Sequence, residues 1–304
     1  MARICPAGKL SSEKLLSPST TNTNLNLTKR FQTLNQLVED AGYRECVMNE
    51  GDAKRWDVTL NYIYPSQKNI VYLSDDLKKN RPIHANQIQI AGHDYGIASI
   101  LPHTQEQAED FYRCILQEKI GAIINISQSD DFGWFGKFKY WPNPHPKMFG
   151  DILVSQLSDP RKFKLSGPST PSEYQVEISE ISIKSPQIER NCTLVRFPDW
   201  QDGHGLKTET LAGLVTLIEA MCKDKKPIIH CANGVGRTGT LFTAIALSKT
   251  PINTIKNADL VDQYIIDGRL CRNKDFVENE GQYKTLIDFA EYKIKGQFTE
   301  ITGN

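Results

Sequence analysis

The sequence predicts an α/β domain, and three of its stretches carry that prediction. Thr104 precedes a segment that is acidic in its first turns, as is typical of a capped helix. The short apolar run from Gly121 to Ser127 follows it and suits a buried strand. Between Phe149 and Phe197, short alternating segments separated by Pro, Gly and Ser have the period of antiparallel strands. Helix followed by strand favours a layered α/β core.

Composition and charge exclude several classes of protein. The chain has 304 residues, with 36 basic and 36 acidic side chains and no formal net charge. This balance gives no argument for nucleic acid or a polybasic membrane patch, because counterion release needs a basic face, although a local basic pocket is still allowed. No apolar run is long enough for a transmembrane helix, and Met1 to Leu10 lacks the apolar centre of a secretory signal.

The cysteines indicate the compartment. All seven are scattered along the chain without CxxC or Cys/His metal spacing. We therefore expect free thiols, a reducing, cytoplasmic compartment and no structural metal.

The chain divides into a polar leader and one globular domain. Residues 1–30 hold a Ser, Thr and Asn-rich stretch with too little apolar surface to offset the entropy of ordering, so we expect a flexible leader. A targeting or delivery signal is the alternative. Residues 31–304 should form the domain, and its first helix is expected from Arg30 to Ala41, where apolar side chains recur at helical spacing.

The remaining expected elements follow in order. They are strands at Asp151 to Gln156, Tyr174 to Lys184 and Cys192 to Phe197, a helix at Leu206 to Met221, a buried strand at Ile228 to Cys231 and an apolar helix beginning near Arg237.

A loop between the last strand and the last helix has the features of a phosphate site. Gly234 and Gly236 permit positive φ and allow backbone N–H groups to converge, and the following helix N-terminus adds a partial positive charge. We expect an anion to be held by the loop residues Ala232, Asn233, Gly234, Val235 and Gly236, together with Arg237.

Two side chains make this loop a candidate catalytic site. Cys231 lies at its start, where the helix N-terminus and a cationic neighbour favour the nucleophilic thiolate. Arg237, six positions later, can offer a bidentate fork to phosphate oxygens. The alternative is a strand, turn and helix around a buried, inert cysteine.

The segment His-Cys-x-x-Gly-x-Gly-Arg-Thr-Gly resembles the signature loop of the protein tyrosine phosphatases. Other stretches resemble that family's segments and occur in its order along about residues 31–295. Lys54 to Val58 resembles the phosphotyrosine-recognition segment, and Gly96 to Tyr112 resembles the segment that enters the long helix. Lys139 to Pro142 resembles the Tyr-Trp-Pro turn. Phe197 to Asp199 resembles the mobile acid loop, and Gly281 to Tyr283 resembles the glutamine loop.

This resemblance implies a fold, a reaction and residue roles. The fold would be a single α/β domain with a central, highly twisted mixed sheet flanked by helices. The reaction would hydrolyse phosphotyrosine on proteins through a cysteinyl-phosphate, with Cys231 as nucleophile and without a metal or other cofactor. Asp199 would be the general acid and, in the second step, the base that activates water, although Asp202 is a nearby rival. Gln282 would place the attacking water, and Thr238 would donate its hydroxyl to the departing thiolate.

The resemblance also implies two residues that recognise the substrate, and this sequence departs from the family at two positions. Trp56 would sandwich the substrate ring, unless it is a core tryptophan, and Asp57 would contact the substrate backbone. Phe197 stands where the family usually has Trp, which leaves the balance of the acid loop open. Glu278 replaces a glutamine of the family, which could slow or redirect the second step.

Four further residues have two interpretations each. Asp130 or Asp131 would position Arg237, or belong to a solvated loop, and the same choice applies to Lys137. His230 would act electrostatically through the loop, or hold backbone in the core.

Two alternative functions remain open, and the sequence also suggests one biological setting. The pocket could belong to a catalytically weak phosphotyrosine-binding module, or to an enzyme for another phosphate such as a phosphoinositide. The loop has no lysine, which disfavours the second alternative. The chain also resembles tyrosine phosphatases that bacterial pathogens deliver into host cells. We expect phosphotyrosine proteins as partners and favour a monomer.

Overall fold

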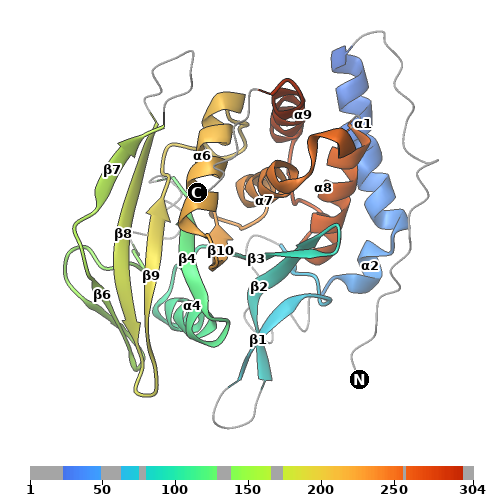
Figure 1. Cartoon of the computed structure of the whole chain (residues 1–304). Helices are drawn as coiled ribbons and strands as arrows, with labels where there is room; N and C mark the ends of the chain where they lie inside the picture. Colours follow the sequence, from blue (N-terminus) through green and yellow to red (C-terminus); the bar gives the residue numbers. More distant parts are fainter. Residues whose placement is uncertain are drawn as a thin grey trace.

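The computed structural model describes residues 23–48, 63–74, 80–128, 138–165, 174–255 and 258–296 as a mixed sheet with helices on both faces (Figure 1). Its strands are β1 (Ile70–Ser74), β2 (Asn80–Ile90), β3 (His93–Ser99), β4 (Ile120–Asn125), β5 (Lys147–Phe149), β6 (Ile152–Gln156), β7 (Arg161–Lys164), β8 (Gln175–Lys184), β9 (Glu189–Arg196) and β10 (Lys226–His230). Its helices are α1 (Thr23–Asp40), α2 (Tyr43–Cys46), α4 (Gln105–Gln117), α6 (Thr208–Met221), α7 (Gly236–Lys249), α8 (Asp259–Cys271) and α9 (Glu280–Ile294), with a 3-10 turn at Ile252–Thr254. The predicted α/β class is confirmed.

The sheet has a parallel centre and antiparallel flanks. Its strand order is β1-β2-β3-β10-β4-β9-β8-β6-β5, and β7 pairs with β8. Strand β10 runs parallel to both β3 and β4, and β4 runs parallel to β9. The outer pairs are antiparallel. The carboxyl ends of four parallel strands therefore meet at one edge, which is where open α/β sheets bind ligands.

Successive residues of the central strands belong to opposite cores. Ile228 packs with Ile123 on one face of the sheet, and Ile229 packs with Ile124 on the other. All four side chains have no exposed surface. A strand buried on both faces has a continuous apolar run instead of an alternating pattern. This explains why the runs around Gly121 and Ile228 could be recognised in the sequence.

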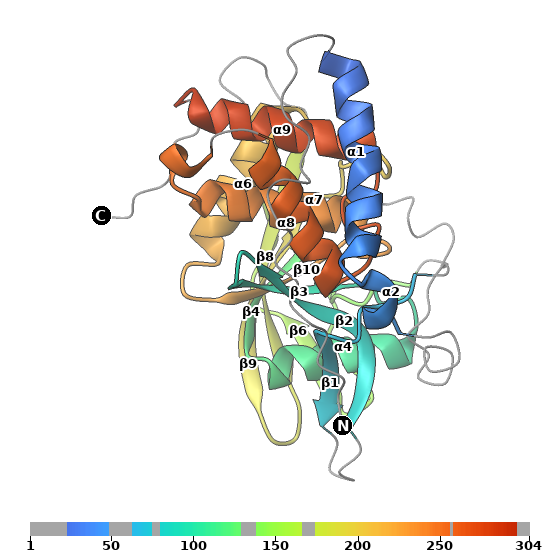
Figure 2. The same ribbon diagram turned by 90° about the vertical axis from the view of Figure 1, so that its right-hand side faces the viewer.

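The helices cover the two faces unequally. Helix α4 packs on one face, and α6, α7, α8 and α9 gather on the other with α1 outermost (Figures 1 and 2). The residues of α7 from Gly236 to Ser248 are all buried, so this helix is a core element with no polar face. Within the described ranges, no helix combines the length and apolarity needed to cross a bilayer.

Helix α1 begins earlier than the sequence predicted. It starts at Thr23 instead of Arg30, so it takes in residues 23–30 of the predicted leader, while residues 1–22 lie outside the described chain. Arg30, the last residue of the predicted leader, is buried and pairs with Asp262 and, at 2.7 Å, with Asp259 of α8. Asp262 also accepts a hydrogen bond from the Tyr283 hydroxyl at 2.6 Å. The first helix is thus tied to the domain at a position assigned to its leader.

Most other predicted elements are confirmed within a few residues. Thr104 caps α4, and its hydroxyl accepts a hydrogen bond from the Gln107 N–H at 3.2 Å. The three predicted strands between Asp151 and Phe197 are β6, β8 and β9, and β8 pairs antiparallel with both of the others. The predicted helix after Leu206 is α6.

Candidate active site

The predicted phosphate loop lies at the carboxyl end of β10. Cys231 follows the last residue of that strand and is 2% exposed, and α7 begins at Gly236. Gly234 has φ +64°, and a Cβ there would lie 2.0 Å from the Ser99 carbonyl oxygen, so only glycine fits. Gly236 does not adopt positive φ, contrary to the prediction. A Cβ there would lie 2.6 Å from Glu278 Oε2, so a larger residue would push the end of that side chain aside.

Arg237 is completely buried and faces the predicted acid loop. Its Nη1 donates to the Trp200 carbonyl oxygen at 3.0 Å and to the Ile126 carbonyl oxygen at 3.4 Å. Its Nη2 pairs with Asp202 Oδ1 at 2.9 Å. Since Asp202 is 55% exposed, the pair links a buried cation to a carboxylate at the surface. The guanidinium therefore holds two groups of the predicted acid loop, the Trp200 carbonyl and the Asp202 carboxylate.

The two candidate acids occupy different places. Asp199 is exposed, and its Oδ2 accepts a hydrogen bond from the Gln175 N–H at 2.7 Å, at the start of β8. Asp202 is the carboxylate on Arg237. Trp200 anchors the loop between them, because it is fully buried and its indole N–H donates to the His204 carbonyl oxygen at 2.8 Å. In this conformation, Asp199 would have to leave Gln175 before it could protonate a substrate.

Phe197, the departure from the usual tryptophan, is fully buried. Its ring lies 5.8 Å from that of Tyr174, centroid to centroid, in a tilted arrangement. The acid loop is thus anchored at Phe197 and again at Trp200.

The start of α9 brings the predicted glutamine to the loop. Gln282 is fully buried, and its Oε1 accepts a hydrogen bond from the Glu278 N–H at 2.8 Å. Asn279 caps the helix by accepting from the Gln282 N–H at 3.0 Å. The Asn279 amide also donates to the Gly203 carbonyl oxygen at 2.9 Å, which joins α9 to the acid loop.

Thr238 and His230 lie behind the loop. Thr238 is fully buried, and its hydroxyl has no hydrogen-bond partner in the described part of the chain. His230 is also buried, with Nδ1 at 3.3 Å from the Cys231 carbonyl oxygen and Nε2 at 2.7 Å from the Tyr140 hydroxyl. A carbonyl only accepts, so Nδ1 carries the proton. Burial lowers the His230 pKa to about 3, which favours the neutral, backbone-holding interpretation over the electrostatic one.

Arg272 hydrogen-bonds to backbone carbonyls of the phosphate loop, and the sequence analysis did not identify it. Its guanidinium donates to the Gly234 carbonyl oxygen at 3.1 Å and to the Asn233 carbonyl oxygen at 3.4 Å. On its other side it donates to Asn86 Oδ1 and His84 Nδ1, both at 2.8 Å. Burial lowers the Arg272 pKa to about 10, and the charge of Cys231 opposes that shift. Arg272 is the C-cap residue of α8 and is followed by polar residues, so no local pattern in the sequence singled it out.

Several predicted residues lie outside the described ranges. Nothing structural is stated for Trp56, Asp57, Asp130, Asp131 and Lys137. The Tyr-Trp-Pro turn is described, and Tyr140 and Trp141 are both buried beside β10 and α4.

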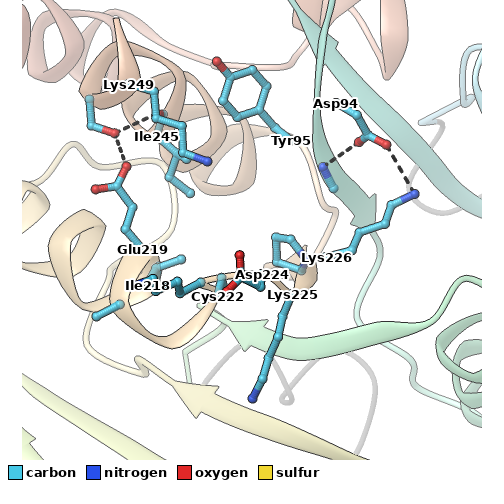
Figure 3. A pocket seen from close by; sticks show the side chains of 15 residues that line it. Asp94, Tyr95, Ile218, Glu219, Cys222, Asp224, Lys225, Lys226, Ile245 and Lys249 are labelled. Carbon is cyan, nitrogen blue, oxygen red and sulfur yellow. Dashed lines mark hydrogen bonds and ion pairs between the residues drawn. The ribbon is translucent and has the colours of Figure 1, made fainter. Parts of the chain in front are cut away.

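A cavity lies at the opposite end of β10. It has a volume of about 880 Å³, and its lining includes Lys226, Cys222, Tyr95 and Lys249 (Figure 3). Lys226 Nζ lies 3.5 Å from Asp94 Oδ2 across its rim. Because Lys226 begins the strand that ends before Cys231, this cavity is separated from the phosphate loop by the length of β10.

Two buried histidines should make the stability of the folded state sensitive to acid. Burial lowers the pKa of His84 and of His230 to about 3, and the Arg272 charge adds to the shift at His84. An unfolded histidine has a pKa near 6.5. The unfolded state therefore binds more protons between about pH 3 and 6.5, so stability is fully present above this window and is lost as the pH falls through it. Each histidine should contribute a slope of about 1.4 kcal/mol per pH unit.

Urea unfolding at pH 7, 6, 5 and 4 measures this slope. The variant His84→Gln should have a shallower slope by one histidine's share, whereas the exposed control His93→Gln should keep the slope of the parent protein. Equal slopes for all three proteins would contradict the prediction.

Comparison with known proteins agrees with this site. A family model described as protein-tyrosine phosphatase matches residues 60–291. The phosphatidylinositol phosphatase PTPRQ of Rattus norvegicus is 26% identical over an alignment of length 311 that covers 95% of this chain and 12% of the relative. The receptor-type tyrosine-protein phosphatase eta of Homo sapiens is 30% identical over 196 residues, which cover 61% of this chain and 13% of the relative.

The matched region includes each described part of the site. Cys231, Arg237, Asp199 and Gln282 all lie within residues 60–291, on a mixed sheet whose parallel strands end at the phosphate loop. The chain spans about an eighth of the length of these curated relatives. Because the family model matches well over half of the chain, this protein belongs to the protein-tyrosine phosphatase family.

Proposed function

We propose that this chain hydrolyses phosphotyrosine on protein substrates through a cysteinyl-phosphate intermediate. One observation carries the proposal: Cys231 and the buried Arg237 lie at the two ends of a glycine-containing loop that leads into the N-terminus of α7. Backbone N–H groups, a helix N-terminus and a guanidinium together stabilise the charge of a phosphate during transfer.

The first step transfers the phosphoryl group to the enzyme. The loop N–H groups of Ala232 to Arg237 hold the phosphate oxygens, and the Arg237 fork replaces its present contact with Asp202 by one with the substrate. The Cys231 thiolate attacks phosphorus in line while the bond to the tyrosyl oxygen breaks. Asp199 supplies the proton to that oxygen after leaving the Gln175 N–H.

The second step returns the enzyme to its starting state. Asp199, now a carboxylate, takes a proton from water as the water oxygen attacks phosphorus, the S–P bond breaks with sulfur leaving as a thiolate, and inorganic phosphate leaves. Gln282 lies at the loop to orient this water, and the buried Thr238 hydroxyl supports the thiolate as it departs.

A phosphoinositide is the second candidate substrate. The relative PTPRQ is named a phosphatidylinositol phosphatase, and it matches 95% of this chain. The loop from Ala232 to Gly236 contains no lysine to meet the additional phosphates of an inositol headgroup, so we favour phosphotyrosine.

Phosphate release from matched substrates decides the question. A phosphotyrosine peptide, its phosphoserine counterpart and a soluble phosphoinositide are compared by kcat/KM. We expect turnover of the phosphotyrosine peptide to exceed the other two. Binding of the peptide without phosphate release would favour a phosphotyrosine-binding module instead, and preferred turnover of the inositol lipid would favour the second candidate.

We further propose that the protein works in a reducing, cytoplasmic compartment and that its partners are phosphotyrosine proteins. The five cysteines whose side chains are described, Cys114, Cys192, Cys222, Cys231 and Cys271, are free thiols, which supports this setting. Delivery into a host cell stays a prediction from the resemblance, as does the monomeric state.

A further inference from the structure

We propose that Asn279 is a positioning residue that holds the acid loop and Gln282 in place relative to each other for hydrolysis of the cysteinyl-phosphate. This inference rests on the proposed function and adds a residue to its second step. In that step two side chains must meet at one water, because Asp199 takes its proton and Gln282 orients it. The two side chains come from segments far apart in the sequence, so the fold has to fix their relative position.

The side-chain amide of Asn279 joins these two segments. Its Oδ1 accepts a hydrogen bond from the Gln282 N–H at 3.0 Å, and its Nδ2 donates to the Gly203 carbonyl oxygen at 2.9 Å. An N–H requires an acceptor and a carbonyl oxygen requires a donor, so both bonds agree on one orientation of the amide. Asn279 therefore uses its acceptor to cap α9 and its donor to hold the acid loop.

Backbone packing beside this amide brings the end of the acid loop onto α9. A Cβ at Gly205 would lie 2.5 Å from the Gly281 carbonyl oxygen and closer still to the Thr285 hydroxyl, so a side chain at this position would push the loop away. The Thr285 hydroxyl also donates to the Leu206 carbonyl oxygen at 3.2 Å. Contacts at Gly203, Gly205 and Leu206 thus hold this segment on the first turns of α9.

The start of α9 also directs the side chain of Gln282. Its Oε1 accepts from the Glu278 N–H at 2.8 Å, which leaves its Nε2 as the donor on the other side of the amide. This Nε2 is buried and has no hydrogen-bond partner among the described residues. A water would satisfy a buried donor of this kind, as the role of Gln282 requires. The place of that water is therefore set by the first turn of α9.

Trp200 connects Asp199 to the segment held on α9. Its indole N–H donates at 2.8 Å to the carbonyl oxygen of His204, in the middle of that segment, and its side chain is fully buried. Asp199 directly precedes Trp200, so the backbone of Asp199 is placed by the same contacts. Its carboxylate now accepts from the Gln175 N–H at 2.7 Å and has to turn into the site. The contact with α9 thus decides how the carboxylate meets the water placed by Gln282.

Three replacements separate the two roles of the Asn279 amide. Asp and Ser are good N-cap residues, so Asn279→Asp and Asn279→Ser should keep the α9 cap and the unfolding midpoint. Neither can replace the bond to the Gly203 carbonyl, because a carboxylate only accepts and a serine hydroxyl that caps the helix is too short to reach. Asn279→Ala loses both bonds and should also lower the unfolding midpoint.

Two kinetic quantities separate the two steps when the substrate is an aryl phosphate of an acidic phenol. The value of kcat/KM reports phosphoryl transfer to Cys231, and an acidic phenol leaves with little help from Asp199. The ratio of phosphoenzyme to free enzyme at saturating substrate, measured by acid quench and mass spectrometry, rises when hydrolysis slows. For Asn279→Asp and Asn279→Ser, we expect kcat/KM within about twofold of the parent value. The phosphoenzyme ratio should rise about three- to tenfold, as is typical for loss of one hydrogen bond.

Matched variants test the packing and control for the added charge. Asn191 is exposed near the start of β9, at the end away from the acid loop, so Asn191→Asp adds the same charge elsewhere and should change neither quantity. Gly205→Ala should push the loop off α9 and raise the phosphoenzyme ratio as Asn279→Ser does. A Cβ at Gly213 would meet only Leu165 within 4 Å, at 3.8 Å, so Gly213→Ala should leave both quantities unchanged.

The outcomes distinguish this inference from the proposed function. Unchanged phosphoenzyme ratios in Asn279→Asp and Asn279→Ser would show that Asn279 only caps α9, and would overturn the inference while leaving the phosphatase intact. A rise in Asn279→Asp alone would assign the effect to the added charge, and a fall in kcat/KM without a rise in the ratio would assign it to a general disturbance of the site. Either result also overturns the inference. A parent protein that neither forms phosphoenzyme nor releases phosphate from any aryl phosphate would contradict the proposed function itself.

Discussion

Replacing Cys231 with serine should lower phosphate release from a phosphotyrosine peptide by about 10⁴-fold or more, equivalent to about 5.4 kcal/mol of transition-state stabilisation. The reason is chemical, because a neutral hydroxyl is a far weaker nucleophile than a thiolate next to a helix N-terminus. The loop, Arg237 and the helix N-terminus remain, so the variant should still bind the peptide. Steady-state assays and calorimetric titration measure the two properties.

Cys222→Ser is the matched control for this change. Cys222 is partly buried in the distant cavity shown in Figure 3, at the opposite end of β10, so its replacement should leave turnover within about twofold of the parent value. Retained activity in the Cys231 variant would exclude the cysteinyl-phosphate mechanism. Loss of activity in the Cys222 variant alone would move the candidate site to that cavity.

Replacing Asp199 with alanine should lower kcat for phosphotyrosine by about 10² to 10⁴-fold, because the leaving phenolate then departs without a proton. The loss should be much smaller for an aryl phosphate whose phenol is more acidic, since that leaving group needs less help. A series of aryl phosphates with graded phenol pKa values measures this dependence. A loss that is equal across the series would show that Asp199 does not act as the acid.

Asp202→Ala decides between the two candidate acids. Asp202 now pairs with Arg237 at 2.9 Å, so its removal should free the guanidinium and strengthen inhibition by inorganic phosphate several-fold. Its effect on kcat should not depend on the leaving group. If Asp202→Ala shows the leaving-group dependence and Asp199→Ala does not, the roles of the two residues are reversed.

The phosphate loop could be predicted because its parts are contiguous in the sequence. A buried strand, a loop with two glycines and an apolar helix follow one another between residues 226 and 249, and local patterns indicate each of them. The α4 cap at Thr104 and strands β6, β8 and β9 were found for the same reason. Each depends on neighbours within one turn or one strand.

Contacts between distant segments could not be predicted. The bond between Arg272 and Asn86 joins residues 186 positions apart, and the Arg237 pair with Asp202 depends on how the acid loop lies. Strands β1, β2 and β3 were not predicted, because their residues 70–99 mix polar and apolar side chains without a clear period. The sequence analysis noted that Gly236 permits positive φ, which this residue does not adopt, and the approach of Glu278 to it could not be read from the sequence.

The hydrogen bonds that Arg272 makes to the phosphate loop have a consequence for the evolution of this site. Arg272 donates to Gly234 and Asn233 on one side, and to His84 and Asn86 of β2 on the other. A change at His84 or Asn86 alone to a side chain that cannot accept would remove one acceptor of the buried guanidinium, at about 1–3 kcal/mol or more. These three positions should therefore vary together among related chains, with His84 and Asn86 replaced only by side chains that still accept hydrogen bonds. Evolution would then preserve the phosphate loop through residues that do not contact the substrate.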